Sequence, residues 1–205
     1  DQQNLDVSGL TGFISTGSLK LDGNETITNL AALQSAGGAI PGLTIYAGNG
    51  DGTADTFPSL IGGNSYVDLT FLSDGAADTF ELAANLNVDG AWTMTSGNVN
   101  ALARDISVAG NVSLAGGTFN SGTGAIIFDG ATNQSVDFGG NPVTDLTFAK
   151  DAEANSVTAT NAGWNVDGIL TLTTGTWDAA TFAHDVAGNW DYSSGTFTFP
   201  EGNSE

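Results

Sequence analysis

The chain of 205 residues carries 23 acidic side chains and only three basic ones, which gives a formal net charge of −20. This balance excludes nucleic-acid binding, because neutralising phosphates requires clustered Lys and Arg, and it opposes contact with anionic membranes. No apolar run approaches the ~18 residues of a membrane-spanning segment, so membrane insertion is not expected. Disorder is not expected either, because 40% of the residues are hydrophobic and recur at regular spacing.

The residue types also indicate a compartment. The chain has no Cys, which excludes a disulfide framework and thiolate metal sites. Few lysines, a large acidic excess and many Asn, Thr, Gly and Ser residues are together typical of extracellular proteins. We therefore expect a secreted protein of the cell surface.

The N-terminal part is the least regular. Residues 1–18 are expected to form an arm or a first strand, which could act in assembly by adding a strand to a neighbouring molecule. Residues 29–36 (NLAALQSA) are helix-prone and are followed by Gly37 and Gly38, a typical C-terminal stop, so one short helix is expected there. Residues 19–205 are expected to form a single repetitive β domain.

Two acidic segments come next along the chain and are candidate calcium loops. Asn49, Asp51 and Asp55 have the spacing N-x-D-G-x-x-D, in which oxygen ligands can converge on one cation if Gly lets the loop curl. Asp74 and Asp78 repeat the D-G-x-A-D-T-F pattern of the first loop. The alternative is that each Asp-Gly pair simply forms a turn. Calcium is the only cofactor that the sequence suggests.

From residue 88 onward the sequence follows a 20-residue repeat. Its anchors, each followed two residues later by Gly, are Val88, Val108, Phe128, Val166 and Val186. Apolar and polar residues alternate after the anchor, and a period of two places the apolar ones on one buried face. The predicted inward residues are Trp92, Val112, Leu170 and Trp190, then Met94, Leu114, Leu172 and Tyr192, and in the next strand Val99, Phe119, Trp177 and Phe197.

Short alternating strands separated by Gly-centred bends favour an all-β fold, and specifically a β-solenoid similar to a parallel β-helix. In such a fold each coil of about 20 residues stacks on the previous one, and about ten coils are expected. An antiparallel β-sandwich is the alternative, because it also uses short alternating strands. The sandwich gives no reason for the same residue type to return at the same phase of each repeat, so the solenoid is preferred.

A longer repeat contains the shorter one. Asp68-Leu69-Thr70-Phe71 matches Asp145-Leu146-Thr147-Phe148, 77 residues later, which divides the domain into units of roughly residues 19–65, 66–142 and 143–205. The segments VAGNVSLAGGTF, FDGATNQSV and DLTF, over roughly residues 66–199, resemble repeats of large secreted bacterial surface proteins, such as β-solenoid adhesins and autotransporter-like passengers. The resemblance implies an exported protein that acts in adhesion, a matrix or a surface layer.

Catalytic groups are sparse. His184 is the single histidine, so no Ser-His-Asp site or two-histidine metal site can form, and it is expected to be buried or to lie at a bend. All four Trp residues lie on the inward phase, which favours core packing over sugar binding. We therefore expect a protein without enzymatic activity that associates with itself into a filament, surface layer or scaffold. The alternative is an adhesin segment or binding module that recognises a surface glycan or a protein.

Overall fold

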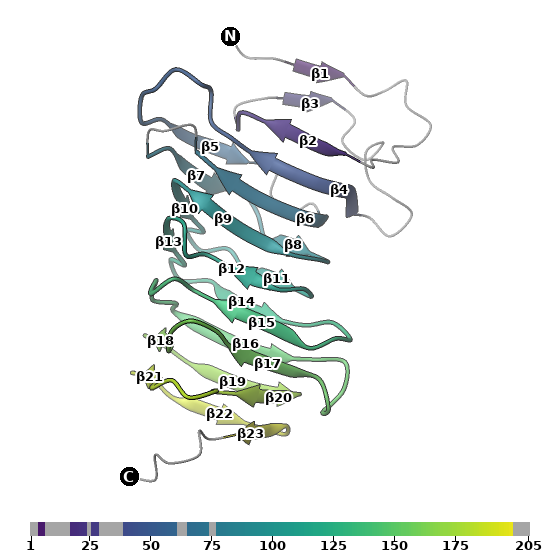
Figure 1. Ribbon diagram of the computed structural model, residues 1–205, viewed down its shortest axis with the longest axis vertical. Helices are drawn as coiled ribbons and strands as arrows, with labels where there is room; N and C mark the ends of the chain where they lie inside the picture. The colour runs from purple at the N-terminus through teal and green to yellow at the C-terminus, as the bar shows by residue number, and fades with distance from the viewer. Residues whose placement is uncertain are drawn as a thin grey trace.

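A computed structural model describes residues 4–6, 17–23, 26–28, 39–60, 65–73 and 77–198. In this part of the chain all paired strands are parallel, and they stack into a β-solenoid of about seven turns (Figure 1). The predicted solenoid is confirmed, and the antiparallel sandwich is wrong. The expected ten coils are too many, because several coils are longer than 20 residues: Leu43 pairs with Asp68, for example, 25 positions later.

Most coils contribute strands to three faces of the stack. The first face consists of β8 (Leu86–Val88), β11 (Ile106–Val108), β14 (Ala125–Phe128), β16 (Asp145–Ala149), β19 (Leu170–Thr174) and β22 (Trp190–Tyr192). The second face consists of β9 (Trp92–Ser96), β12 (Val112–Ser113), β15 (Gln134–Asp137), β17 (Ser156–Ala159), β20 (Thr176–Asp178) and β23 (Thr196–Thr198). The third face holds β5 (Thr56–Leu60), β7 (Thr79–Leu82), β10 (Asn98–Asn100) and β13 (Thr118–Asn120), and further down β18 (Asn165–Val166) and β21 (Asp185–Val186). The coil of β14 and β15 contributes only the bridge of Val143 to Val166 on the third face.

The N-terminal coils have longer strands. β6 (Ser65–Leu72) serves two faces, because its start pairs with β8 and its remainder with β9. β4 (Ala39–Tyr46) pairs with β6 on one side and with β2 (Ser18–Leu21) on the other. Within the expected N-terminal arm, β1 (Asn4–Asp6) pairs with β3 (Thr26–Thr28) of the same chain. The helix expected at residues 29–36 lies outside the described residues.

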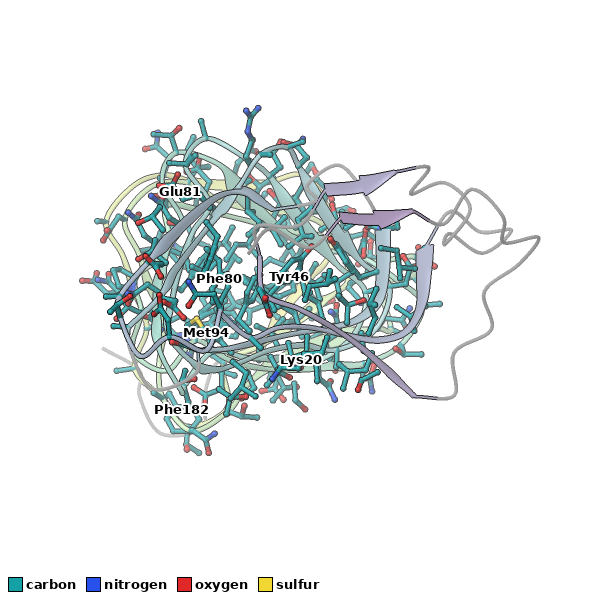
Figure 2. The ribbon with its side chains drawn as sticks, turned by 90° about the horizontal axis from the view of Figure 1, so that it is seen from above. Lys20, Tyr46, Phe80, Glu81, Met94 and Phe182 are labelled. Atoms are coloured by element: carbon teal, nitrogen blue, oxygen red, sulfur yellow. The ribbon has the colours of Figure 1, made fainter. Side chains whose placement is uncertain are left out.

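The core is a column of apolar side chains along the solenoid axis. One such column on the first face is Leu86, Ile106, Ile126, Leu146 and Leu170, all buried and in register. Looking down the stack, Figure 2 shows Tyr46, Phe80 and Met94 in the interior, with Glu81 and Lys20 at the rim. The alternation read from the sequence therefore assigns the inward face correctly through most of the stack, because every second side chain of a strand points to the same side.

The five repeat anchors do not form one column. Val88, Val108 and Phe128 stack on the first face, whereas Val166 and Val186 stack on the third. The shift arises between Phe128 and Val166. Two turns on the first face lead from Ile126 through Leu146 to Leu170, which is 170 − 126 = 44 residues, but the step between anchors Phe128 and Val166 is only 166 − 128 = 38. The anchor of the later copy, Val166, therefore lies on the third face, before the chain returns to the first.

Candidate functional site

The first predicted calcium loop is a compact turn between β4 and β5. The Asn49 amide donates to Asp55 Oδ2 at 2.8 Å and to Asp51 Oδ2 at 3.2 Å, so the structure brings these three predicted residues together. Asp51 Oδ1 accepts from the Thr53 hydroxyl at 2.6 Å and from the Thr53 backbone N–H at 2.7 Å. These bonds to Thr53 lower the pKa of Asp51 despite the opposing effect of desolvation.

The same bonds restrict what the loop can hold. Its carboxylate oxygens already accept N–H and O–H groups of the loop, as expected of an Asp-Gly turn. A cation would have to displace the Asn49 amide. In the part of the chain that the structure describes, no three Asp, Glu or His side chains are grouped as metal ligands would be. Calcium binding here stays a prediction.

Asp78 of the second predicted loop has a different position. Its carboxylate is buried, with Oδ1 accepting from the Asp55 backbone N–H at 3.0 Å and Oδ2 accepting from the Ser73 hydroxyl at 3.1 Å. Asp78 thereby ties the first acidic loop to the next coil through the backbone. Asp74 lies outside the described residues.

The C-terminal coil presents the largest exposed aromatic side chains of the described residues. Trp190 and Tyr192 stack in register on buried Leu170 and Leu172, so they occupy inward positions of β22, yet they are 51% and 64% exposed. The expectation that Trp190 is core is therefore wrong. Burial of an inward side chain requires a coil on each side, and the described chain supplies only the one above.

The backbone of this coil is open as well. β22 pairs with β19 and β23 pairs with β20, and within the described ranges neither has a strand on its other edge. Trp190 and Phe197 pack on each other and on Trp177, with ring centroids 4.5–5.4 Å apart. The last described coil thus presents the outer edge of β22 beside an aromatic cluster. We call Trp190, Tyr192 and Phe197 with strands β22 and β23 the open end.

Lys150 is a buried basic side chain that the sequence pattern did not reveal. Its ammonium donates to the Asp129 carbonyl oxygen and to Gln134 Oε1, and the Gln134 amide in turn donates to the Val108 carbonyl oxygen at 2.9 Å. Burial lowers the pKa of Lys150 and raises that of Asp129, against their mutual attraction. Gly175 leaves the space that this side chain occupies, since a Cβ there would lie 2.5 Å from Lys150 Cγ.

His184 has a structural position, as expected. It is half-buried and hydrogen-bonds to the backbone of Trp164 and Ala179. No helix in the described part of the chain is long and apolar enough to cross a membrane. The chain matches no family model, no curated protein and no solved structure.

Proposed function

We propose that this protein is a secreted structural protein of the cell surface or extracellular matrix, and that its copies associate end to end through the open end. The observation that carries the proposal is the exposure of Trp190 and Tyr192 at inward positions of the last described coil. Covering side chains of this size removes a large apolar area from water. The outer edge of β22, which has no strand beside it in the described part of the chain, would gain hydrogen bonds in the same contact.

A second copy fits this surface better than an unrelated partner. The occupant must offer parallel strands on two faces, with apolar side chains directed at the axis in the register of Leu170 and Leu172. Coils of this chain have that arrangement from β4 to β23. Such a head-to-tail contact does not close on itself, so it extends into a filament.

The net charge of −20 opposes this association. The repulsion acts over distances that salt screens, whereas strand pairing and aromatic burial act at contact. Association should therefore strengthen as the salt concentration rises. Pairing through exposed acidic and basic side chains would instead weaken with salt.

Sedimentation velocity over a range of protein and salt concentrations tests the proposal. Trp190→Ser with Tyr192→Ser should abolish the end-to-end species. Leu102→Ser with Ile169→Ser is the matched control, because these side chains are 42% and 43% exposed elsewhere on the solenoid, and it should leave association unchanged. Wild-type protein that stays monomeric at high concentration and high salt would contradict the proposal.

The second candidate is a glycan-binding segment of an adhesin. It is favoured by the same exposed pair, because Trp190 and Tyr192 lie on one side of β22 and flat aromatic rings stack on sugar faces. A monomeric wild-type protein that binds an array of surface glycans, and loses binding when Trp190 and Tyr192 are changed, would support this alternative over self-association.

A further inference from the structure

His184 connects two successive coils through its two ring nitrogens. The backbone N–H of Trp164 donates to Nδ1 at 3.1 Å, and Nε2 lies 3.0 Å from the Ala179 carbonyl oxygen. Because a backbone N–H can only donate, Nδ1 carries no proton, and Nε2 carries the proton that bonds to Ala179. Both bonds together require the neutral imidazole in a single tautomer.

The ring is also enclosed by aromatic side chains. Trp164 and Trp177 are stacked with an interplanar angle of 6°, and His184 stands at 88° to both, with ring centroids 5.3 and 5.0 Å away. The backbones of the two coils also approach closely here, since a Cβ on Gly163 would lie 1.7 Å from the Ala183 carbonyl oxygen.

We propose that His184 is a proton-operated latch on the C-terminal coil: the neutral ring holds residues 179–198 to the preceding coil, and protonation releases them. Protonation places an N–H at Nδ1 directly against the N–H of Trp164, and two donors cannot bond. Cation–π attraction to the indoles favours the charged ring, but it leaves this donor–donor contact in place. The contact is relieved when the ring and the coil that carries it move away from Trp164.

Among the described residues, no charged side chain compensates the protonated ring. Asp185 and Asp167 are exposed, as is Asp191 on the next coil, and the half-buried Asp178 accepts from the Ala180 backbone N–H at 2.9 Å. Desolvation lowers the pKa of His184 below its ordinary value of 6.5, with only the Ala179 bond acting in the opposite direction. The unfolded coil therefore takes up the proton at higher pH than the folded coil. The stabilisation is complete above pH 6.5 and is lost as the pH falls through the folded-state pKa.

The latch lies next to the open end. Trp177, which contacts the His184 ring, also packs on Trp190 and Phe197. Release of the coil would therefore disturb the surface by which copies associate, so acid should reduce association. This last consequence rests on the proposed function, whereas the opening of the coil does not.

Hydrogen exchange of the full chain tests the opening, after correction for the intrinsic pH dependence of exchange. As the pH falls from 6.5 to the folded-state pKa, exchange in residues 179–198 should accelerate by up to about tenfold per pH unit and then level off, while β8 to β13 stay protected. His184→Gln, which keeps one acceptor and one donor but does not titrate in this range, should exchange at a pH-independent corrected rate. Equal acid acceleration in both proteins would overturn the proposal.

Nitrogen NMR of the single histidine provides a second measurement that needs no variant. The spectrum of the wild-type ring should show the Nε2–H tautomer at pH 8 and protonation only below pH 6.5. An Nδ1–H tautomer, or a pKa at or above 6.5, would overturn the latch even if His184→Gln fails to fold. Coil opening in acid without any change in sedimentation would support the proposal for His184 and contradict the proposed end-to-end association.

Discussion

The carboxylate of Asp145 accepts a hydrogen bond from the backbone N–H of Ile169 on the next coil at 2.7 Å, and Asp68 accepts one from Ala91 at the same distance. Each Asp opens one copy of the D-L-T-F segment. The residue before each donor is Gly90 or Gly168, where a Cβ would lie 2.4 or 2.3 Å from the Asp oxygen. The Asp of one repeat and the Gly of the next are therefore parts of one contact between coils.

This contact predicts a specific loss of stability. Asp145→Ala should lower the free energy of unfolding by about 1.5–3 kcal/mol, because a backbone donor loses a charged acceptor. Asp167→Ala removes the same charge from an exposed side chain nearby and should change stability by at most about 0.5 kcal/mol. Urea denaturation of both variants gives the comparison. Equal effects would mean that only the reduced net charge matters.

The open end predicts that two tryptophans at equivalent inward positions differ in importance. Trp92→Ala should cost about 3–5 kcal/mol, because Trp92 is fully buried and its loss leaves a cavity. Trp190→Ala should cost about 1 kcal/mol or less in the monomer, because half of the side chain is already in water. Thermal unfolding at low protein concentration measures both. A large cost at Trp190 would show that another coil covers it.

These residues illustrate what the sequence predicts and what it does not. Alternation predicted the inward position of both Trp92 and Trp190, because side-chain direction is a local property of a strand. Burial depends on whether another coil follows, which no local pattern contains. The solenoid face on which a repeat anchor lies could not be predicted from a local pattern either. Changes in the number of residues at the corners leave the alternation intact, yet they place Val166 on a different face from Val88.

The candidate site shows a similar division. The structure brings Asn49, Asp51 and Asp55 together in one loop, as near neighbours in a Gly-rich turn can be, whereas calcium binding by them stays a prediction. The buried position of Lys150 could not be predicted, since Lys is ordinarily exposed and its partners Asp129 and Gln134 lie 21 and 16 residues away. Contacts between coils join residues that are far apart in the sequence, so, unlike turns, they cannot be recognised from neighbouring residues.

Two positions with left-handed backbone should respond oppositely to substitution. Leu102 has φ of 59° and is 42% exposed, so Leu102→Asn should raise the free energy of unfolding by about 0.5–1 kcal/mol, because Asn tolerates this conformation. Leu72→Asn, at an exposed strand position, is the control and should not stabilise.

Gly122, with φ of 61°, lies one coil further on, and a Cβ there would be 1.5 Å from the Leu102 carbonyl oxygen. Gly122→Ala should cost at least about 2 kcal/mol, and a tolerated Gly122→Ala would contradict this close approach.

Calcium should raise the melting temperature if the loop of Asn49, Asp51 and Asp55 binds it, because a ligand of the folded state alone stabilises that state. Asn49→Asp replaces the amide that occupies both carboxylates with a third carboxylate. This variant should melt lower than wild type without calcium and show a larger rise with calcium. Asp51→Asn with Asp55→Asn should remove the response.

Magnesium and sodium separate binding from screening in the calcium experiment. Magnesium should stabilise much less than calcium, because it prefers a tight octahedral shell. Equal stabilisation by sodium at matched ionic strength would mean that salt merely screens the net charge of −20. That result would indicate that the loop is a turn held by its own hydrogen bonds and not a calcium site.

The last prediction concerns the buried amine. Lys150 donates to the Asp129 carbonyl oxygen and to Gln134 Oε1, so Lys150→Met keeps most of the volume but leaves one buried and one partly buried acceptor without this donor. Replacing a whole buried polar group by apolar atoms can be neutral, but removing one partner leaves the others desolvated and unpaired. We expect Lys150→Met to lower the free energy of unfolding by about 1–3 kcal/mol.

Lys20→Met is the matched control for this change, because Lys20 is exposed on β2 and its removal changes the net charge of the protein by the same amount. It should alter stability by at most about 0.5 kcal/mol. Urea denaturation of the two variants at one pH separates the buried contact from the overall charge. If Lys150→Met is as stable as Lys20→Met, the hydrogen bonds of Lys150 only offset the free energy of burying its charge. The polar cluster of Lys150, Asp129 and Gln134 then makes no net contribution to holding the three coils together.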